Sequence, residues 1–206
     1  LSEAEETTEV SVLSDQNEMS VLKKVFAINA VMFIVGFVGS WLAESTGLLA
    51  DSLDMFADAT VFGLSIFAVG RSIRHKQKAA RLSGYLQMIL AIFALSEVVR
   101  RVFMGSEPQG PFMMILAAVA LVANAACMYL LSSHRRGEVH MQASWIFLSN
   151  DVIANLGVIF AGALVHVFNS KVPDLVVGFI IALVVFRGAL NIIKLAKSNE
   201  SSQSET

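Results

Sequence analysis

Six apolar stretches, each long enough to cross a lipid bilayer as a helix, constrain this chain more than any other feature of its sequence. About 20 helical residues are needed to span the roughly 30 Å of hydrocarbon in a bilayer. Hydrophobic types make up 55% of the 206 residues and charged types only 16%, whereas soluble domains carry charges on about a quarter of their residues. We therefore predict an all-α membrane protein with six transmembrane helices. The predicted spans are residues 22–43, 48–70, 79–104, 111–132, 141–168 and 174–196.

Basic residues beside the six spans indicate how the chain is oriented, because Lys and Arg are enriched in the cytoplasmic loops of membrane proteins. With a cytoplasmic N-terminus, twelve Lys and Arg residues flank the spans on the cytoplasmic side, and only Arg100, Arg101 and Lys171 lie on the other side. We therefore expect both termini in the cytoplasm. The expected membrane is a bacterial inner (plasma) membrane.

The two ends of the chain have the composition of polar tails. Residues 1–20 hold six of the 17 acidic residues and show no hydrophobic period, which predicts a disordered acidic N-terminal tail. Residues 21–197 are predicted to form the six-helix transmembrane domain. Residues 198–206 are predicted to be a short polar C-terminal tail.

Three aspartates, Asp51, Asp54 and Asp58, interrupt the second span. Asp54 and Asp58 are four residues apart, so a helix places them on one face. A carboxylate near the middle of a transmembrane helix costs about 2.5–3.5 kcal/mol on insertion, so three on one helix need a compensating partner. Asp51 lies nearest the helix start and could instead cap the helix N-terminus. Intramembrane acids usually have a function, and we predict one for Asp54 and Asp58.

A fourth acid, Asp151, is the only charged residue between Met141 and Ser170 in the fifth span. The second and fifth spans are antiparallel in the predicted topology, so Asp151 can meet Asp58 near the middle of the membrane. The second and fifth spans contain no Lys or Arg, so no salt bridge within these two spans can compensate the acids. We expect the acids either to be protonated or to bind a dication through their oxygens. A transport site could use both states in turn, because metal binds the deprotonated form.

The stretch GLLADSLDMFAD, from Gly47 to Asp58, resembles the second-helix signature of cation diffusion facilitators. The resemblance covers roughly residues 22–196 and implies a dimeric six-helix transporter of zinc and related divalent metals that exchanges metal for protons. In that family a His or Asp, then three residues, then Asp forms half of the transport site. The matching positions here are Asp54 and Asp58, and Asp151 matches the second member of a similar pair on the fifth helix.

The sequence departs from the pattern of this family at two points. The first ligand position on the fifth helix is occupied by Phe147, which cannot bind metal, so a fourth ligand must come from Asn150, Asn155, Asp51 or water. We prefer Asn150 because it is adjacent to Asp151. The sequence also ends soon after the sixth span, so we expect a short member without the cytoplasmic C-terminal domain of typical members, which would form a homodimer through its membrane helices.

Together these features predict a secondary transporter and not an enzyme. The expected function is efflux of a divalent metal by metal/proton antiport and alternating access. The expected metal ligands are Asp54, Asp58 and Asp151, with Asn150 and Asp51 as further candidates. Zn²⁺ is the first choice of cargo on the resemblance, and Cd²⁺, Fe²⁺, Mn²⁺ and Co²⁺ are alternatives because oxygen ligands make a harder site.

Two other functions compete with transport. One is a membrane metal sensor or scaffold that keeps the site without moving metal. The other, an intramembrane aspartyl enzyme, is disfavoured because no Gly-x-Gly-Asp element surrounds Asp58 or Asp151. The expected partners are the metal, protons, the lipid bilayer and a second copy of the chain, with no bound cofactor and no nucleic acid.

Overall fold

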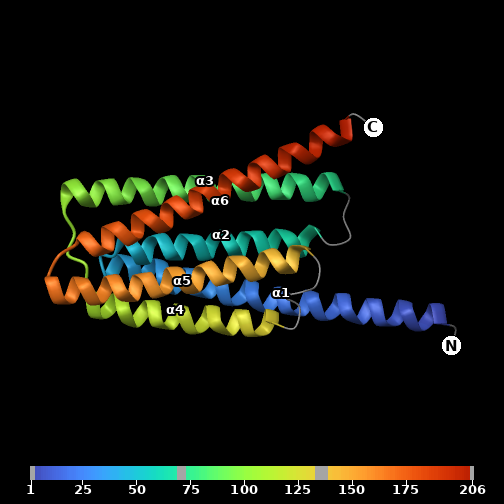
Figure 1. Cartoon of the computed structure of the whole chain (residues 1–206), viewed down its shortest axis with the longest axis horizontal. Coiled ribbons are helices and arrows are strands. Elements are labelled where there is room, and N and C mark those ends of the chain that lie inside the picture. The colour runs from blue at the N-terminus through green and yellow to red at the C-terminus, as the bar shows by residue number, and fades with distance from the viewer. Residues whose placement is uncertain (1–2, 69–72, 133–138, 205–206) are drawn as a thin grey trace.

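The computed structural model of the chain is a bundle of long helices (Figure 1). It describes the backbone of residues 3–68, 73–132 and 139–204, and side chains within residues 19–66, 81–132 and 148–194. Six helices follow one another in these described ranges. They are α1 (Glu3–Leu42), α2 (Thr46–Ala68), α3 (Ile73–Met104), α4 (Gly110–Leu131), α5 (Val139–Phe168) and α6 (Val172–Ser204).

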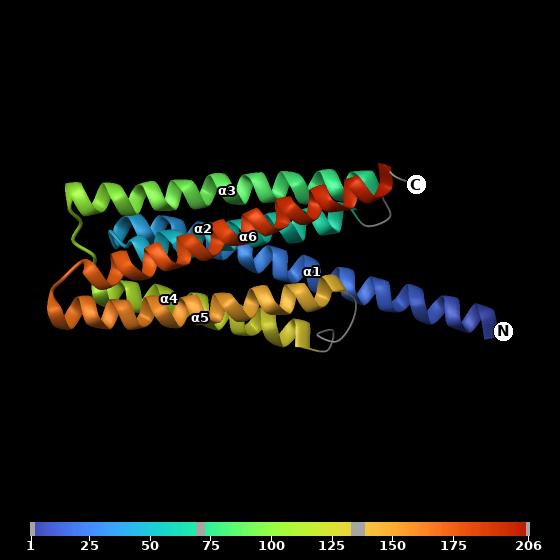
Figure 2. The same ribbon diagram turned by 45° about the horizontal axis from the view of Figure 1, so that its top comes forward.

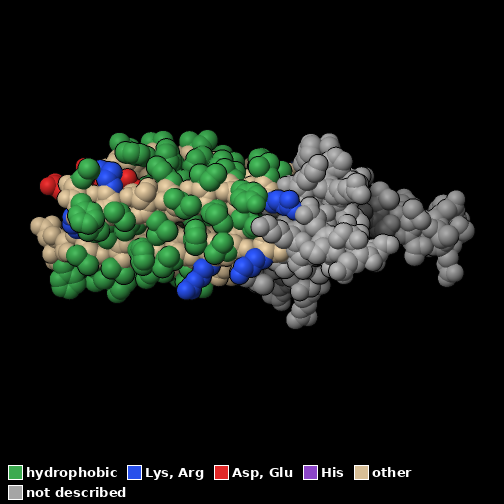
Figure 3. Space-filling model, turned by 90° about the horizontal axis from the view of Figure 1, so that it is seen from above, with side chains coloured by type: hydrophobic (Ala, Val, Ile, Leu, Met, Phe, Trp, Pro, Cys, Tyr) green, Lys and Arg blue, Asp and Glu red, His purple; other side chains and the backbone are tan. Residues whose placement is uncertain are grey.

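Each helix coincides with one of the six predicted spans, and the all-α membrane architecture is confirmed. Five helices, all except α2, contain apolar stretches of 21 to 24 residues, which are long enough to cross a membrane. α2 has a similar length of 23 residues, about 34 Å, but it carries the three aspartates. Apolar side chains cover most of the described surface in Figure 3, as expected for a surface that faces lipid.

Three helices extend well beyond their predicted spans, and one of them is α3, which begins at Ile73 and not at residue 79. α1 begins at Glu3 and runs through the segment predicted to be a disordered tail, and α6 continues to Ser204 through the predicted C-terminal tail. The predicted boundaries at residues 20 and 197 are therefore not helix ends. A formed helix gains one hydrogen bond for each further residue, and residues 1–20 contain no Gly or Pro that would stop it.

The helices run back and forth between two ends of the bundle. α1 starts and α6 finishes at the same end, which we call the terminal end (Figures 1 and 2). The turns at residues 43–45, 105–109 and 169–171 lie at the opposite end, which we call the hairpin end. α2 therefore starts at the hairpin end where α5 finishes, and the two helices are antiparallel.

α2 is the central helix of the bundle, because it contacts all five other helices. α3 and α6 lie side by side (Figures 1 and 2), while α1 packs on α2 and α4 packs on α5. A residue on α2 is consequently surrounded by protein on most sides. This arrangement explains how a helix with three acids is kept from lipid.

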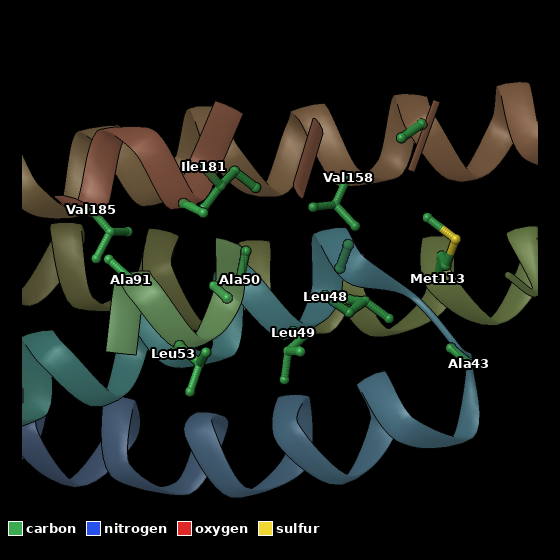
Figure 4. Close-up of a cluster of buried hydrophobic side chains, with 14 of the residues drawn as sticks. Ala43, Leu48, Leu49, Ala50, Leu53, Ala91, Met113, Val158, Ile181 and Val185 are labelled. Atoms are coloured by element: carbon green, nitrogen blue, oxygen red, sulfur yellow. The ribbon is translucent and has the colours of Figure 1, made fainter. Parts of the chain in front are cut away.

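Among the described residues, two of the three groups of buried apolar side chains lie on either side of the middle of α2. The larger group, the hairpin-side core, joins Leu48, Leu49 and Leu53 of α2 to residues of α3, α4, α5 and α6 (Figure 4). The smaller group lies nearer the terminal end, and we call it the terminal-side core. It consists of Leu22, Val25, Phe62, Cys127, Leu131 and Leu148. Along α2, Asp54 and Asp58 come between the residues of these two cores.

At the hairpin end, ion pairs stabilise the last turns of α3, and hydrogen bonds from Lys171 connect α3 to the turn before α6. Glu97 accepts hydrogen bonds from Arg100 (2.7 Å from Nε to Oε2) and from Arg101 (2.7 Å from Nε to Oε1). The Nζ of Lys171, in the turn before α6, donates to the main-chain oxygen of Arg101 at 3.0 Å and to that of Val102 at 3.3 Å. The end of α3 is thereby joined to the start of α6.

α6 approaches the start of α2 closely at Gly178. A Cβ atom on this residue would lie 2.8 Å from the main-chain carbonyl carbon of Thr46 and 3.0 Å from the nitrogen of Gly47. Both neighbours are backbone atoms that cannot rotate away. Only glycine allows the two helices to come this close.

We expect the substitution Gly178→Ala to destabilise the protein by about 1–3 kcal/mol, the usual cost of overpacking a filled interior. Gly157→Ala is the matched control, because its Cβ would meet Val177 at 3.7 Å, an ordinary contact. Thermal unfolding of the detergent-solubilised variants measures both effects. Equal melting temperatures for the two variants would contradict the close approach of α6 to α2.

Candidate metal centre

The three aspartates of α2 lie in the interior of the bundle. Asp51 is 4% exposed and Asp58 is 3% exposed, whereas Asp54 keeps part of its surface accessible. Asp54 and Asp58 are one helical turn apart on the same face, as predicted.

Asp174 of α6 caps the start of α2, a role that the sequence did not reveal. This residue is fully buried, and its Oδ2 accepts a hydrogen bond from the main-chain nitrogen of Thr46 at 2.7 Å. Its Oδ1 accepts one from the nitrogen of Gly47 at 2.9 Å and one from the hydroxyl of Ser45 at 2.6 Å. The hydroxyl of Ser45 also accepts from the nitrogen of Leu48 at 3.1 Å. The free donors of the first turn are thus satisfied.

Asp51 is not the cap of α2. The helix begins at Thr46, so Asp51 lies more than a full turn inside it, and the capping bonds come from Asp174 and Ser45. The capping alternative considered for Asp51 is therefore wrong. Asp51 lies close enough to Asp151 to repel it electrostatically, which puts it beside the acid cluster.

Asp58 of α2 and Asp151 of α5 meet between the two antiparallel helices. Their carboxyl groups lie within hydrogen-bonding reach of each other. One oxygen of each, Oδ2, is buried and has no hydrogen-bond partner. Asp54 also lies within electrostatic range of Asp151. The meeting predicted from the antiparallel topology is present in the structure.

Two carboxyl groups in contact inside a protein cannot both carry an uncompensated charge, because their repulsion and desolvation are too costly. Either a proton or a cation must accompany them. Within the described residues 19–66, 81–132 and 148–194, no Lys or Arg is recorded in an ion pair with either acid; the described ion pairs are those of Glu97. The Asp58–Asp151 pair therefore needs a bound proton or cation to neutralise it.

The two asparagines near Asp151 have different surroundings. Asn150 is exposed, since one residue along a helix turns the side chain by about 100°. Asn155 is one turn from Asp151 on the same face and is fully buried. Its Nδ2 donates to the main-chain oxygen of Asp151 at 2.8 Å, and its Oδ1 has no hydrogen-bond partner. The side chain of Phe147 lies outside the described residues.

Two further buried asparagines face the interior from α1 and α4. Asn29 donates through Nδ2 to the main-chain oxygen of Val25 at 3.0 Å, which leaves its Oδ1 without a partner. Asn124 has an Nδ2 without a partner. Asn29, Asn124 and Asn155 therefore each keep one buried amide atom without a hydrogen-bond partner.

The acids do not form a finished metal site by themselves. In the part of the chain whose side chains are described, no three His, Cys, Asp or Glu side chains are close enough together to hold a metal ion. Asp58 and Asp151 are paired, and Asp54 is one turn away from Asp58. A complete set of ligands therefore needs either a small movement of these helices or a ligand of another type.

A bundle of long apolar helices that encloses a group of carboxylates defines a multi-pass integral membrane protein with an acidic centre. Comparison with known families agrees with this description. Residues 22–198 match the cation efflux transmembrane domain. The chain belongs to the cation efflux family, and the resemblance to cation diffusion facilitators is confirmed.

Individual relatives have low sequence identity but cover most of this chain. Zinc transporter ZitB of Escherichia coli is 26% identical over 200 residues, which cover 89% of this chain and 63% of the relative. Metal cation efflux system protein CzcD of Cupriavidus metallidurans is 25% identical over 166 residues, covering 75% and 52%. A probable proton-coupled zinc antiporter of Homo sapiens is 24% identical over 210 residues, covering 82% and 49%.

The chain thus spans at most 63% of the length of these relatives. The names of these relatives describe metal transport or efflux. The bacterial relatives agree with the expected location in a bacterial plasma membrane.

Proposed function

We propose that this chain is a divalent metal efflux transporter that exchanges metal for protons by alternating access. Asp54, Asp58 and Asp151 act as the carboxylate ligands of the cargo, and Asp51 adds negative charge beside them. The cytoplasm lies at the terminal end of the bundle, in agreement with the basic residues that flank the spans. Metal then enters from the terminal end and leaves at the hairpin end.

The contact between Asp58 and Asp151 is the observation that carries this proposal. Each residue keeps one buried oxygen without a hydrogen-bond partner, which costs about 1–3 kcal/mol per group, and more for a charged one. A dication satisfies both oxygens and neutralises both charges. When the metal leaves, a proton binds again to the carboxyl pair of Asp58 and Asp151. Binding therefore links the release of protons to the uptake of metal.

Zn²⁺ is the proposed cargo, because relatives of the chain carry the names of zinc transporters. Carboxylate ligands without His or Cys form a hard site, so Cd²⁺, Co²⁺, Fe²⁺ and Mn²⁺ remain alternative cargoes. A homodimer formed through the membrane helices completes the proposal. The exposed surface of α1 and α3 carries apolar side chains that a second copy could cover, such as Val38, Trp41, Ile89 and Phe93.

Apolar side chains separate the acids from both ends of the bundle. Among the described side chains, the hairpin-side core is the larger of the two, and the terminal-side core holds six buried residues. Asp58 lies close enough to Cys127 of the terminal-side core to interact with it electrostatically. Alternating access requires that each core open in turn while the other stays closed.

Purified chain in proteoliposomes is expected to accumulate Zn²⁺ when the lumen is acidic, with protons leaving the lumen as the metal enters. A zinc-sensitive dye and a pH-sensitive dye sealed in the same vesicles measure both fluxes. Vesicles without protein give the leak, and dissipating the proton gradient with a protonophore should slow uptake. Zinc binding without any flux would favour the sensor or scaffold and contradict the transporter.

A further inference from the structure

Asn155 of α5 is a buried polar residue whose arrangement is not explained by packing alone. Its side chain is fully buried. The hydrogen bond from its Nδ2 to the main-chain oxygen of Asp151 fixes the amide group against α5. Its Oδ1 has no partner, although buried acceptors are nearly always satisfied. The residue therefore presents an oriented and unused oxygen in the interior.

The antiparallel arrangement of α2 and α5 brings this oxygen to the level of an acid. Asp58 and Asp151 are in contact. Four residues toward the hairpin end from Asp58 is Asp54, and four residues in the same direction from Asp151 is Asn155. Both steps equal one helical turn, about 6 Å along the axis. Asp54 and Asn155 thus lie opposite each other, one turn from the acid pair.

We propose that Asn155 is the fourth ligand of the transported metal, binding through its Oδ1. This inference rests on the proposed function and adds to it a neutral ligand on the side of Asp151 that faces the hairpin end. The site then consists of two turns of α2, with Asp54 and Asp58, facing two turns of α5, with Asp151 and Asn155.

The charge of the site favours a neutral fourth ligand. Three carboxylates already exceed the charge of a dication by one, and a neutral fourth ligand keeps this excess at one. An amide oxygen completes the coordination without further charge and is a usual ligand for hard divalent ions. Asn150 cannot play this part in the described arrangement, because it is exposed on a different side of α5 from Asp151.

Direct metal binding to the purified full chain tests this inference. Asn155→Ala should weaken Zn²⁺ binding, measured by equilibrium dialysis, by at least about 10-fold, since even residues behind the ligands typically contribute that much. Asn191→Ala is the control, because it removes an exposed asparagine from α6 and should leave binding unchanged. Asn150→Ala tests the competing candidate and should also bind as the wild type does.

The substitution Asn155→Asp separates a ligand from a structural residue. It removes the Nδ2 donor to Asp151, as Asn155→Ala does, but it keeps an oxygen at the same place. Retained binding in Asn155→Asp together with weak binding in Asn155→Ala supports the proposal. Weak binding in both variants would show that the hydrogen bond to Asp151 is what matters and would overturn it.

Two other results are decisive in different ways. If the wild-type chain binds zinc and Asn155→Ala binds it equally tightly, Asn155 is not a ligand. The proposed transport function would then still stand. Failure of the wild-type chain to bind any of the five candidate metals would instead overturn the proposed function. The two failures are therefore distinguishable in one set of measurements.

Discussion

Asp58→Ala and Asp151→Ala are each expected to reduce zinc transport in proteoliposomes by about 100-fold or more. Each variant removes one of the carboxylate ligands proposed for the metal, and a 100-fold loss of affinity corresponds to about 2.8 kcal/mol of binding free energy. The two variants should be equally defective, because each removes one half of a pair in direct contact. The double variant should be no worse than either single one.

The loss of transport reports on the acid site only if both variants still insert normally into the membrane. Both variants remove a buried acid from a transmembrane bundle, so we expect normal expression and a melting temperature no lower than that of the wild type. Asp51→Asn is the graded comparison and should reduce transport less, because Asp51 acts on the pair only through its charge. Wild-type flux in Asp151→Ala would remove this residue from the site.

Asp174→Ala is expected to lower the free energy of unfolding by about 3–5 kcal/mol. The substitution removes the acceptor of three hydrogen bonds, from Ser45, Thr46 and Gly47, and each buried donor left unpaired costs about 1–3 kcal/mol. The loss should be less than the sum because the helix end can fray. Thermal unfolding in detergent, followed by circular dichroism, measures the change.

Glu107→Ala is the matched control for Asp174→Ala. It removes an acid from the same end of the bundle, but one that is exposed, and it should leave the melting temperature unchanged. Asp174→Asn keeps one acceptor oxygen and should fall between the wild type and Asp174→Ala. A melting temperature of Asp174→Ala equal to that of the wild type would show that the cap contributes little.

The positions of the helices could be predicted from the sequence because each depends on a local property. A run of about 20 apolar residues is sufficient to indicate a membrane helix, and all six runs coincide with helices. The meeting of Asp58 and Asp151 followed from the order and direction of the spans. The helical ends of α1 and α6 were not predicted, because a polar composition by itself does not end a helix that is already formed.

Two features of the site could not be predicted in the same way. Asp174 stands at the start of an apolar span, where an acid ordinarily serves its own helix, and only the packing of α6 on α2 shows that it caps a different one. The preference for Asn150 over Asn155 followed adjacency in the sequence. The helical period contained the better signal, because residue 155 shares a face with Asp151 and residue 150 does not.

The bonds from Asp174 to the start of α2 also limit how the acids can move. If these bonds stay intact, α2 and α6 can separate only by tilting relative to each other about the start of α2, which then acts as a hinge. Asp58 lies 12 residues beyond Thr46, about 18 Å from this pivot at 1.5 Å per residue. A rotation of roughly 10° then displaces Asp58 by ~3 Å, which is comparable with the length of one hydrogen bond. A small tilt of one helix is therefore sufficient to make or break contact with α5.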